Sequence, residues 1–112
     1  MKLLDWETDF IAQLTYLTTE EGGRTGVFIS GYRPQVKFPF SKQMTSGQQI
    51  LLDKEMVFPG ESVKVELALM APITFKHQLS IGQEFEVREG ARIVGRGEIL
   101  EILNKDLLKP TN

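Results

Sequence analysis

The stretch FEVREGARIVG, residues 85–95, predicts a tight β-hairpin. Phe85 and Val87 alternate with charged neighbours, which is the period-2 pattern of a strand with one buried face. Glu89-Gly90 interrupts this pattern, and an apolar run resumes over Ala91–Gly95. A glycine between two such runs is typical of a short hairpin turn, because glycine readily adopts the positive φ that these turns need.

The same alternation occurs in other parts of the chain. It covers Phe10–Tyr16, Val36–Phe40 and Val63–Leu69, while Gln48–Glu55 fits a helical turn or a strand equally well. Pro59-Gly60 supplies the two central residues that a type II turn requires. Short strands separated by turns, at a spacing of roughly 8–12 residues, indicate a closed barrel or a sandwich. The sequence therefore predicts an all-β fold.

The length of the chain suits one domain. It has 112 residues, of which 41% are hydrophobic and 25% charged, so it can build an ordinary core. No internal linker or repeat divides it, and we expect a single domain over residues 1–112. Residues 1–8 and 105–112 are expected to be frayed tails, although Leu103–Leu108 also suits one helical turn.

Composition excludes several classes of protein. The net charge of −2 and the absence of an apolar run of roughly 20 residues predict no attraction to a membrane and no span through one. The polar N-terminus does not resemble a signal peptide. There is no cysteine, so disulfides and thiolate zinc sites are excluded. We expect a cytoplasmic protein without a cofactor or a metal.

No motif in the chain predicts an enzyme. The phosphate-binding pattern G-x-x-x-x-G-K-[ST] is absent, so we expect no binding of GTP. Gly95-Arg96-Gly97 lacks the third glycine of a dinucleotide fingerprint, and it fits a bulge or close packing inside a strand. Glu84 and Glu86 alternate with apolar residues, which favours a solvated outer face over a catalytic carboxylate pair.

Five segments, read in order, resemble one family. They are Glu20-Glu-Gly-Gly-Arg24, Gly31-Tyr-Arg-Pro-Gln35, Glu55-Met-Val-Phe-Pro-Gly60, Ala71-Pro-Ile73 and Arg88-Glu-Gly-Ala-Arg-Ile-Val-Gly95. Together they resemble the C-terminal, third domain of bacterial elongation factor Tu, over about residues 10–103. The resemblance implies a six-stranded closed antiparallel β-barrel, here expected as a stand-alone chain without the factor's GTPase domain.

The resemblance also implies an RNA-binding surface, because this domain of the family contacts the T stem of aminoacyl-tRNA. The matched positions are Arg24, Gln35, Ser46, Glu89 and Gly90. A serine replaces the family's threonine at Ser46 and keeps the hydroxyl, whereas Ala71 stands where the family often has a basic residue or histidine. Arg96 replaces an alanine on the face that would meet the GTPase domain, so it marks a candidate partner face and is expected to be exposed.

Two interpretations of these residues remain open. Arg24 can meet an RNA phosphate, or it can pair with Glu20 or Glu21 beside it. The leading function is a non-catalytic, translation-related binding module whose partner is tRNA-like RNA, bound weakly, or a protein. One alternative is a protein-interaction or structural module that has lost RNA binding and that could form a homodimer. Another alternative is that the chain is a fragment of a longer GTPase translation factor.

Overall fold

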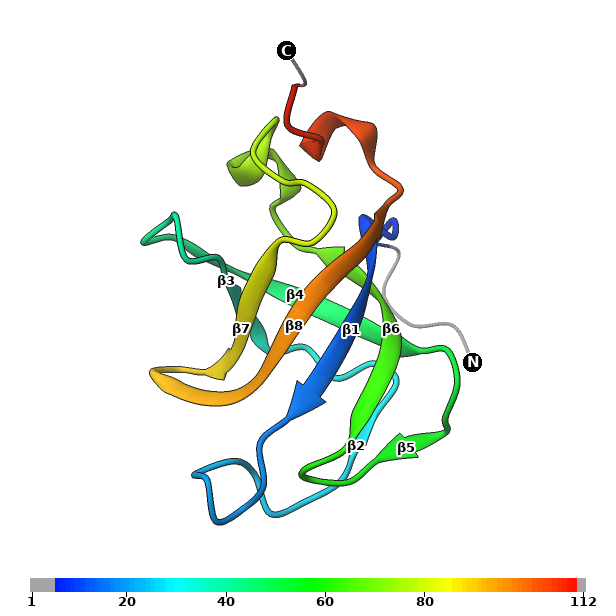
Figure 1. The fold of residues 1–112 in the computed structure, drawn as a ribbon, viewed down its shortest axis with the longest axis vertical. Coiled ribbons are helices and arrows are strands. Elements are labelled where there is room, and N and C mark those ends of the chain that lie inside the picture. The colour runs from blue at the N-terminus through cyan, green and yellow to red at the C-terminus, as the bar shows by residue number, and fades with distance from the viewer. Residues whose placement is uncertain (1–5, 111–112) are drawn as a thin grey trace.

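The protein is a closed barrel of six antiparallel strands, described here by a computed structural model over residues 6–110. Around the barrel the strands follow the order β1-β6-β4-β3-β7-β8 (Figure 1). Their bounds are Phe10–Tyr16 for β1, Gln35–Lys37 for β3, Met44–Leu51 for β4, Ser62–Leu69 for β6, Glu84–Glu89 for β7 and Arg92–Ile102 for β8. The prediction of a six-stranded closed antiparallel barrel is confirmed.

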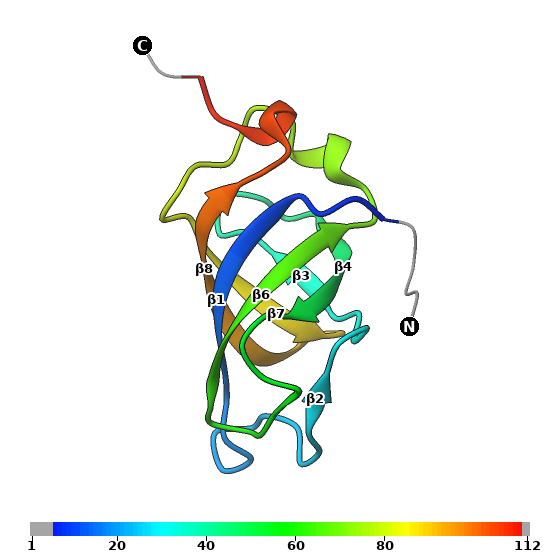
Figure 2. The same ribbon diagram turned by 90° about the vertical axis from the view of Figure 1, so that its right-hand side faces the viewer.

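Three smaller pieces of structure lie at the two ends of the barrel. Strands β2 (Phe28–Ile29) and β5 (Met56–Val57) pair as a separate two-stranded sheet at one end. Two 3-10 turns, η1 (Pro72–Phe75) and η2 (Lys105–Leu107), contact each other at the opposite end (Figure 2). No helix within the described residues is long and apolar enough to cross a membrane.

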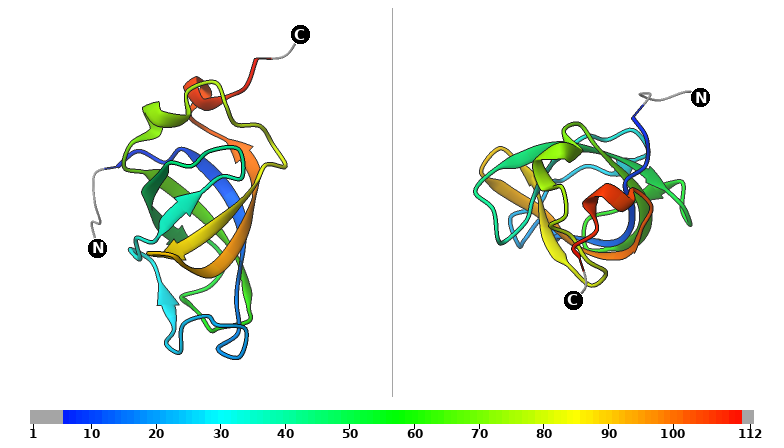
Figure 3. Two further views of the ribbon diagram at one scale, coloured as in Figure 1. Left: turned by 90° about the vertical axis from the view of Figure 1, so that its left-hand side faces the viewer. Right: turned by 90° about the horizontal axis from the view of Figure 1, so that it is seen from above.

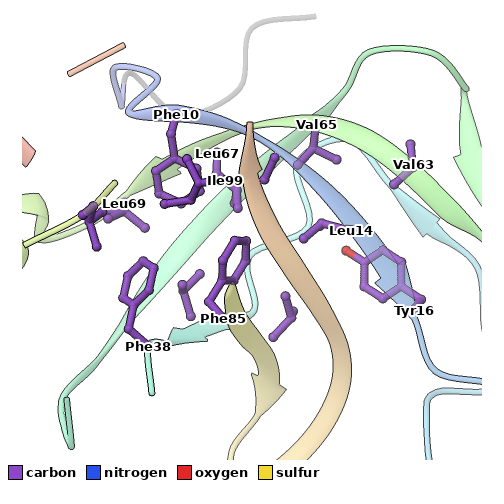
Figure 4. Close-up of a cluster of buried hydrophobic side chains, with 14 of the residues drawn as sticks. Phe10, Leu14, Tyr16, Phe38, Val63, Val65, Leu67, Leu69, Phe85 and Ile99 are labelled. Carbon is purple, nitrogen blue, oxygen red and sulfur yellow. The ribbon is translucent and has the colours of Figure 1, made fainter. Parts of the chain in front are cut away.

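Alternating side chains of the strands fill the barrel interior. Figure 4 shows Phe10, Leu14 and Tyr16 of β1 pointing into this interior. The ring of Phe10 meets that of Phe85 edge-on, with 5.7 Å between centroids. Such edge-to-face contacts favour a fixed core arrangement beyond simple burial of apolar area.

The barrel closes by pairing its first strand with its last. Strand β1 lies between β6 and β8, with Phe10 opposite Leu67 on one side and Ile102 on the other. A view along the barrel shows the ring of strands (Figure 3). Because both edges of β1 are paired, closure leaves no free edge on this strand.

Both turns read from the sequence form, the first as expected and the hairpin turn one residue later than the predicted Glu89-Gly90. Gly60 has a φ of +91°, and the Glu61 amide donates to Phe58 O at 3.0 Å, as in a type II turn. At the hairpin, Glu89 pairs with Arg92, so the turn consists of Gly90-Ala91 with Gly90 at φ +64°. The second strand continues well past the predicted Gly95.

Strand lengths differ from expectation in the middle of the chain. Strand β3 ends at Lys37, and the expected Phe40 of the alternating run is exposed. Its ring instead stacks on Phe38 with 5.5 Å between centroids. Of the ambiguous segment Gln48–Glu55, the first four residues belong to β4, which continues to Leu51 between two barrel neighbours, and the rest forms a bend.

The expectation of a frayed C-terminal tail is wrong for Lys105–Lys109. Leu107 is buried, the Leu79 amide donates to Leu107 O at 2.9 Å, and Lys109 N donates to Leu79 O at 2.6 Å. The single helical turn expected near Leu108 is η2. Residues 1–5 and 111–112 of the expected tails lie outside the described residues.

Candidate nucleic-acid interface

Arg24 is held between two aromatic rings and one carboxylate. Its guanidinium carbon lies 5.0 Å from the ring centroids of both Phe28 and Tyr32. Its Nη1 is 3.4 Å from Oε2 of Glu89, and Tyr32 donates its hydroxyl to the same oxygen at 2.6 Å. Cation–π stacking and a shared carboxylate therefore fix a long side chain that remains partly exposed.

The carboxylates closest to Arg24 in sequence do not pair with it. Glu21 accepts a hydrogen bond from the Thr18 amide at 2.8 Å, while the Glu21 amide donates to the Thr18 hydroxyl. The bond from the Thr18 amide, with a smaller contribution from the Thr18 side chain, lowers the pKa of the Glu21 carboxyl. The expected pairing of Arg24 with Glu20 or Glu21 is thus replaced by a pairing with Glu89, which lies on a different strand.

The double glycine before Arg24 has two separate structural reasons. Gly22 adopts a φ of +97°, where other residues are strained. At Gly23 an added Cβ would lie 2.6 Å from Leu17 O, so a side chain has no room. Arg92 donates from Nε to Gly22 O at 2.9 Å and from Nη2 to Gly23 O, and thereby ties this turn to the β7–β8 hairpin.

A second group of predicted residues lies side by side on three strands. Gln35 of β3 is opposite Ser46 of β4 on one side and opposite Arg88 of β7 on the other. All three are half-buried, whereas their neighbours Val36 and Val87 point into the core. The three side chains therefore belong to the outer surface of the barrel.

The two groups join through consecutive residues of β7 and its turn. Arg88 stands beside Gln35, and the next two residues are Glu89, which contacts Arg24, and Gly90. Strand pairing places Gln35 beside Ser46 and Arg88, and Glu89, the partner of Arg24, follows Arg88 in the chain. We call the five residues of the implied RNA-binding site the Arg24–Ser46 patch: Arg24, Gln35, Ser46, Glu89 and Gly90.

Arg96 lies outside this patch. It is exposed on the outer face of β8, as predicted, opposite Glu86 of β7 and Thr15 of β1. Among the described residues it makes no ion pair, because the Glu86 carboxylate accepts instead from Arg88 Nε at 3.0 Å. Arg96 helps to line a shallow hollow of about 400 Å³ on this face.

Sequence reasoning missed three residues that shape the patch. Tyr32 and Arg88 lie within the two motifs that carry the resemblance, but nothing in their spacing shows which side chains they contact. Arg92 lies in the same motif as Arg88, and its guanidinium is engaged by the backbone oxygens of the glycine turn. Burial, together with the hydrogen bond to Glu89, raises the pKa of Tyr32 above its ordinary value.

Fold and patch together define a small β-barrel domain with one polar, partly pre-ordered surface. The sequence model of the family described as "Elongation factor Tu C-terminal domain" matches residues 4–103 of the chain. The chain therefore belongs to the elongation factor Tu C-terminal domain family and is a domain related to translation factors.

Proposed function

We propose that the chain is a non-catalytic module that binds tRNA-like RNA weakly through the Arg24–Ser46 patch. The observation that carries this proposal is that separate segments of the chain meet here: Arg24 contacts Glu89 of β7, and Gln35 lies opposite both Ser46 and Arg88. Membership of a translation-factor domain family supports the same class of partner.

The chemistry of the patch suits phosphates and other polar groups of an RNA. Arg24, already ordered by its aromatic neighbours, can meet a phosphate with little loss of side-chain entropy. Gln35, Ser46 and Glu89 offer an amide, a hydroxyl and a carboxylate, which can bond to 2′-hydroxyls across a shallow minor groove.

Gln35 carries a feature that a ligand would relieve. Its Oε1 is enclosed and has no hydrogen-bond partner among the described residues. An enclosed acceptor without a donor costs free energy, so a side-chain rotation toward an RNA hydroxyl would be favoured. This supports a contact from Gln35 to the ligand.

The expected affinity is low because few cations are free. Lys37 donates to Phe38 O at 2.9 Å, and Arg92 is occupied by the glycine turn. Arg24, which also contacts Glu89, and at most one or two neighbours can reach phosphates, so log K should fall with log salt at a slope of about −2 to −3.

A tRNA titration at low and moderate salt tests the proposal. Arg24→Ala should remove about one unit of the salt slope, and Gln35→Ala should change the preference among RNAs more than the slope. Arg33→Ala serves as a matched control, because Arg33 is an exposed arginine outside the patch. No binding at about 50 mM salt, or equal effects of the two arginine variants, would overturn the proposal.

A further inference from the structure

The small β2–β5 sheet has one buried and one exposed face, and both are apolar. Phe28 and Val57 face each other across the sheet and are buried. Ile29 and Met56, the next pair, point the other way and are 54% and 44% exposed. The sheet therefore presents large apolar side chains to solvent rather than the polar side chains expected on an outer face.

Two further side chains extend this exposed face. Val27 precedes Phe28 and Phe58 follows Val57, so strand alternation places both on the side of Ile29 and Met56. They are 40% and 51% exposed. We call these four residues the apolar quartet. A group of exposed apolar side chains on adjoining strands marks an interaction surface more often than scattered ones do.

Acidic side chains lie on the turns next to the quartet. Exposed carboxylates at this end of the barrel belong to Glu20, Glu21, Asp53, Glu55 and Glu61. The turn that carries Glu61 lies against the one that carries Glu21, because Gly60 N donates to Tyr16 O at 3.0 Å and an added Cβ on Gly60 would touch Thr18.

The cations at this end do not cancel these charges. Lys54 donates to Ser62 O at 2.8 Å and lies 3.9 Å from a Glu61 oxygen. Arg24 is already paired with Glu89. Exposed Lys64 also lies here, since its amide donates to Asp53 Oδ1 at 3.4 Å. The five carboxylates outnumber Lys54 and Lys64, so the rim of the quartet is net negative.

We propose that the apolar quartet docks a basic, amphipathic segment of a partner protein. Apolar side chains of the segment would cover Ile29, Met56 and their neighbours, and lysines or arginines would meet the carboxylates of the rim. RNA phosphates and a second copy of this chain would both bring negative charge against the same rim, which disfavours each of them. Four half-exposed side chains form a small contact area, so the complex is transient.

The probe is a synthetic amphipathic helix of leucine and lysine, about five turns long, titrated into the full chain while amide resonances are followed by NMR. We expect shifts at β2, β5 and the adjoining turns, with an affinity that weakens as salt rises. A peptide with glutamate in place of lysine is the paired probe, and it should bind far more weakly.

Two pairs of substitutions test the apolar part. Ile29→Ser with Met56→Ser should weaken binding of the leucine–lysine peptide about tenfold, which equals a loss of about 1.4 kcal/mol. The matched control, Ile73→Ser with Ile81→Ser, removes side chains that are 74% and 67% exposed near the opposite end. That control should leave the affinity within about twofold, a difference of less than 0.5 kcal/mol or so.

Two pairs of neutralising substitutions test the charged rim. Glu20→Gln with Glu55→Gln should weaken binding, whereas Glu84→Gln with Glu98→Gln, which changes the net charge equally on the β7–β8 face, should not. If both pairs weaken peptide binding equally, the peptide is attracted by the overall charge of the protein, and the proposed docking site is wrong.

Three other results would also overturn the proposal. They are equal binding of the glutamate peptide, a loss of tRNA binding in the Ile29→Ser, Met56→Ser variant, and self-association that this variant abolishes. The proposal does not depend on RNA binding by the Arg24–Ser46 patch. Failure of the tRNA titration would therefore leave it standing, and failure of the peptide titration would leave the RNA proposal standing.

Discussion

Gly97 sets the space available inside the barrel. A Cβ built on it would collide with the Phe85 ring and would lie 2.6 Å from Leu14 Cδ2. Both neighbours are fully packed core residues on adjacent strands, so neither can withdraw. Gly97 belongs to the Gly95-Arg96-Gly97 run that partly matches a dinucleotide fingerprint in the sequence. In the structure, its missing side chain leaves room for the Phe85 ring.

We expect Gly97→Ala to lower the free energy of unfolding by about 1–3 kcal/mol, because it overpacks a full core. Urea denaturation of the purified domain measures this. Gly26→Ala is the control, since its Cβ would make only an ordinary contact, 3.6 Å from Arg24 Nη2. Equal stability of the two variants would contradict the packing argument.

Asp9 is a buried carboxylate that connects three parts of the chain. It accepts from Leu69 N at 2.7 Å and from Asn104 Nδ2 at 2.8 Å, while its backbone oxygen accepts from Leu103 N. Burial raises its pKa above the ordinary 3.8, although both side-chain hydrogen bonds act in the opposite direction. Desolvation of the charged form therefore dominates.

The raised pKa of Asp9 predicts a specific pH dependence. Just above pH 3.8 the native state keeps a proton that the unfolded chain has lost, so the free energy of unfolding falls as pH rises through the folded pKa. Asp9→Asn cannot titrate and should lack this component. Urea unfolding of both proteins at several pH values should show wild type losing stability relative to the variant as pH rises. Parallel curves would refute the assignment.

At the scale of elements, local sequence patterns predicted the structure correctly where residues that are close in sequence are also close in space. The β7–β8 hairpin could be predicted because alternation and one glycine determine it. The packing of Lys105–Lys109 could not, because it depends on Leu79, which lies far away in the sequence. The same limit applies to the patch, where motifs indicated Arg24 but not its partner Glu89.

The C-terminal turn η2 should contribute to stability through a single side chain. Leu107 is 1% exposed, so Leu107→Ala is expected to lower the free energy of unfolding by about 2–4 kcal/mol through lost burial and an unfilled cavity. Leu108→Ala is the neighbouring control, because Leu108 is 37% exposed and should cost less than about 1 kcal/mol. Similar thermal midpoints for the two variants would mean that this turn does not brace the barrel.

For the whole molecule, we expect no binding of guanine nucleotides. The chain has no phosphate-binding loop, and a barrel of this family does not by itself supply one. Isothermal calorimetry with GTP and with GDP, each in the presence of magnesium, should give no heat of binding. A stoichiometric complex at micromolar concentration would contradict this expectation.

The pairing of β1 with β8 has a consequence for synthesis of the chain. The ribosome makes β1 before the other strands, but its partner β8 is complete only roughly 90 residues later, which takes about 5–18 s at ordinary elongation rates. Throughout this interval β1 is a nascent amphipathic strand without its closing neighbour. The ring can be completed only after translation of Ile102, so a ribosome that stalls before Arg92 holds a chain suited to capture by chaperones.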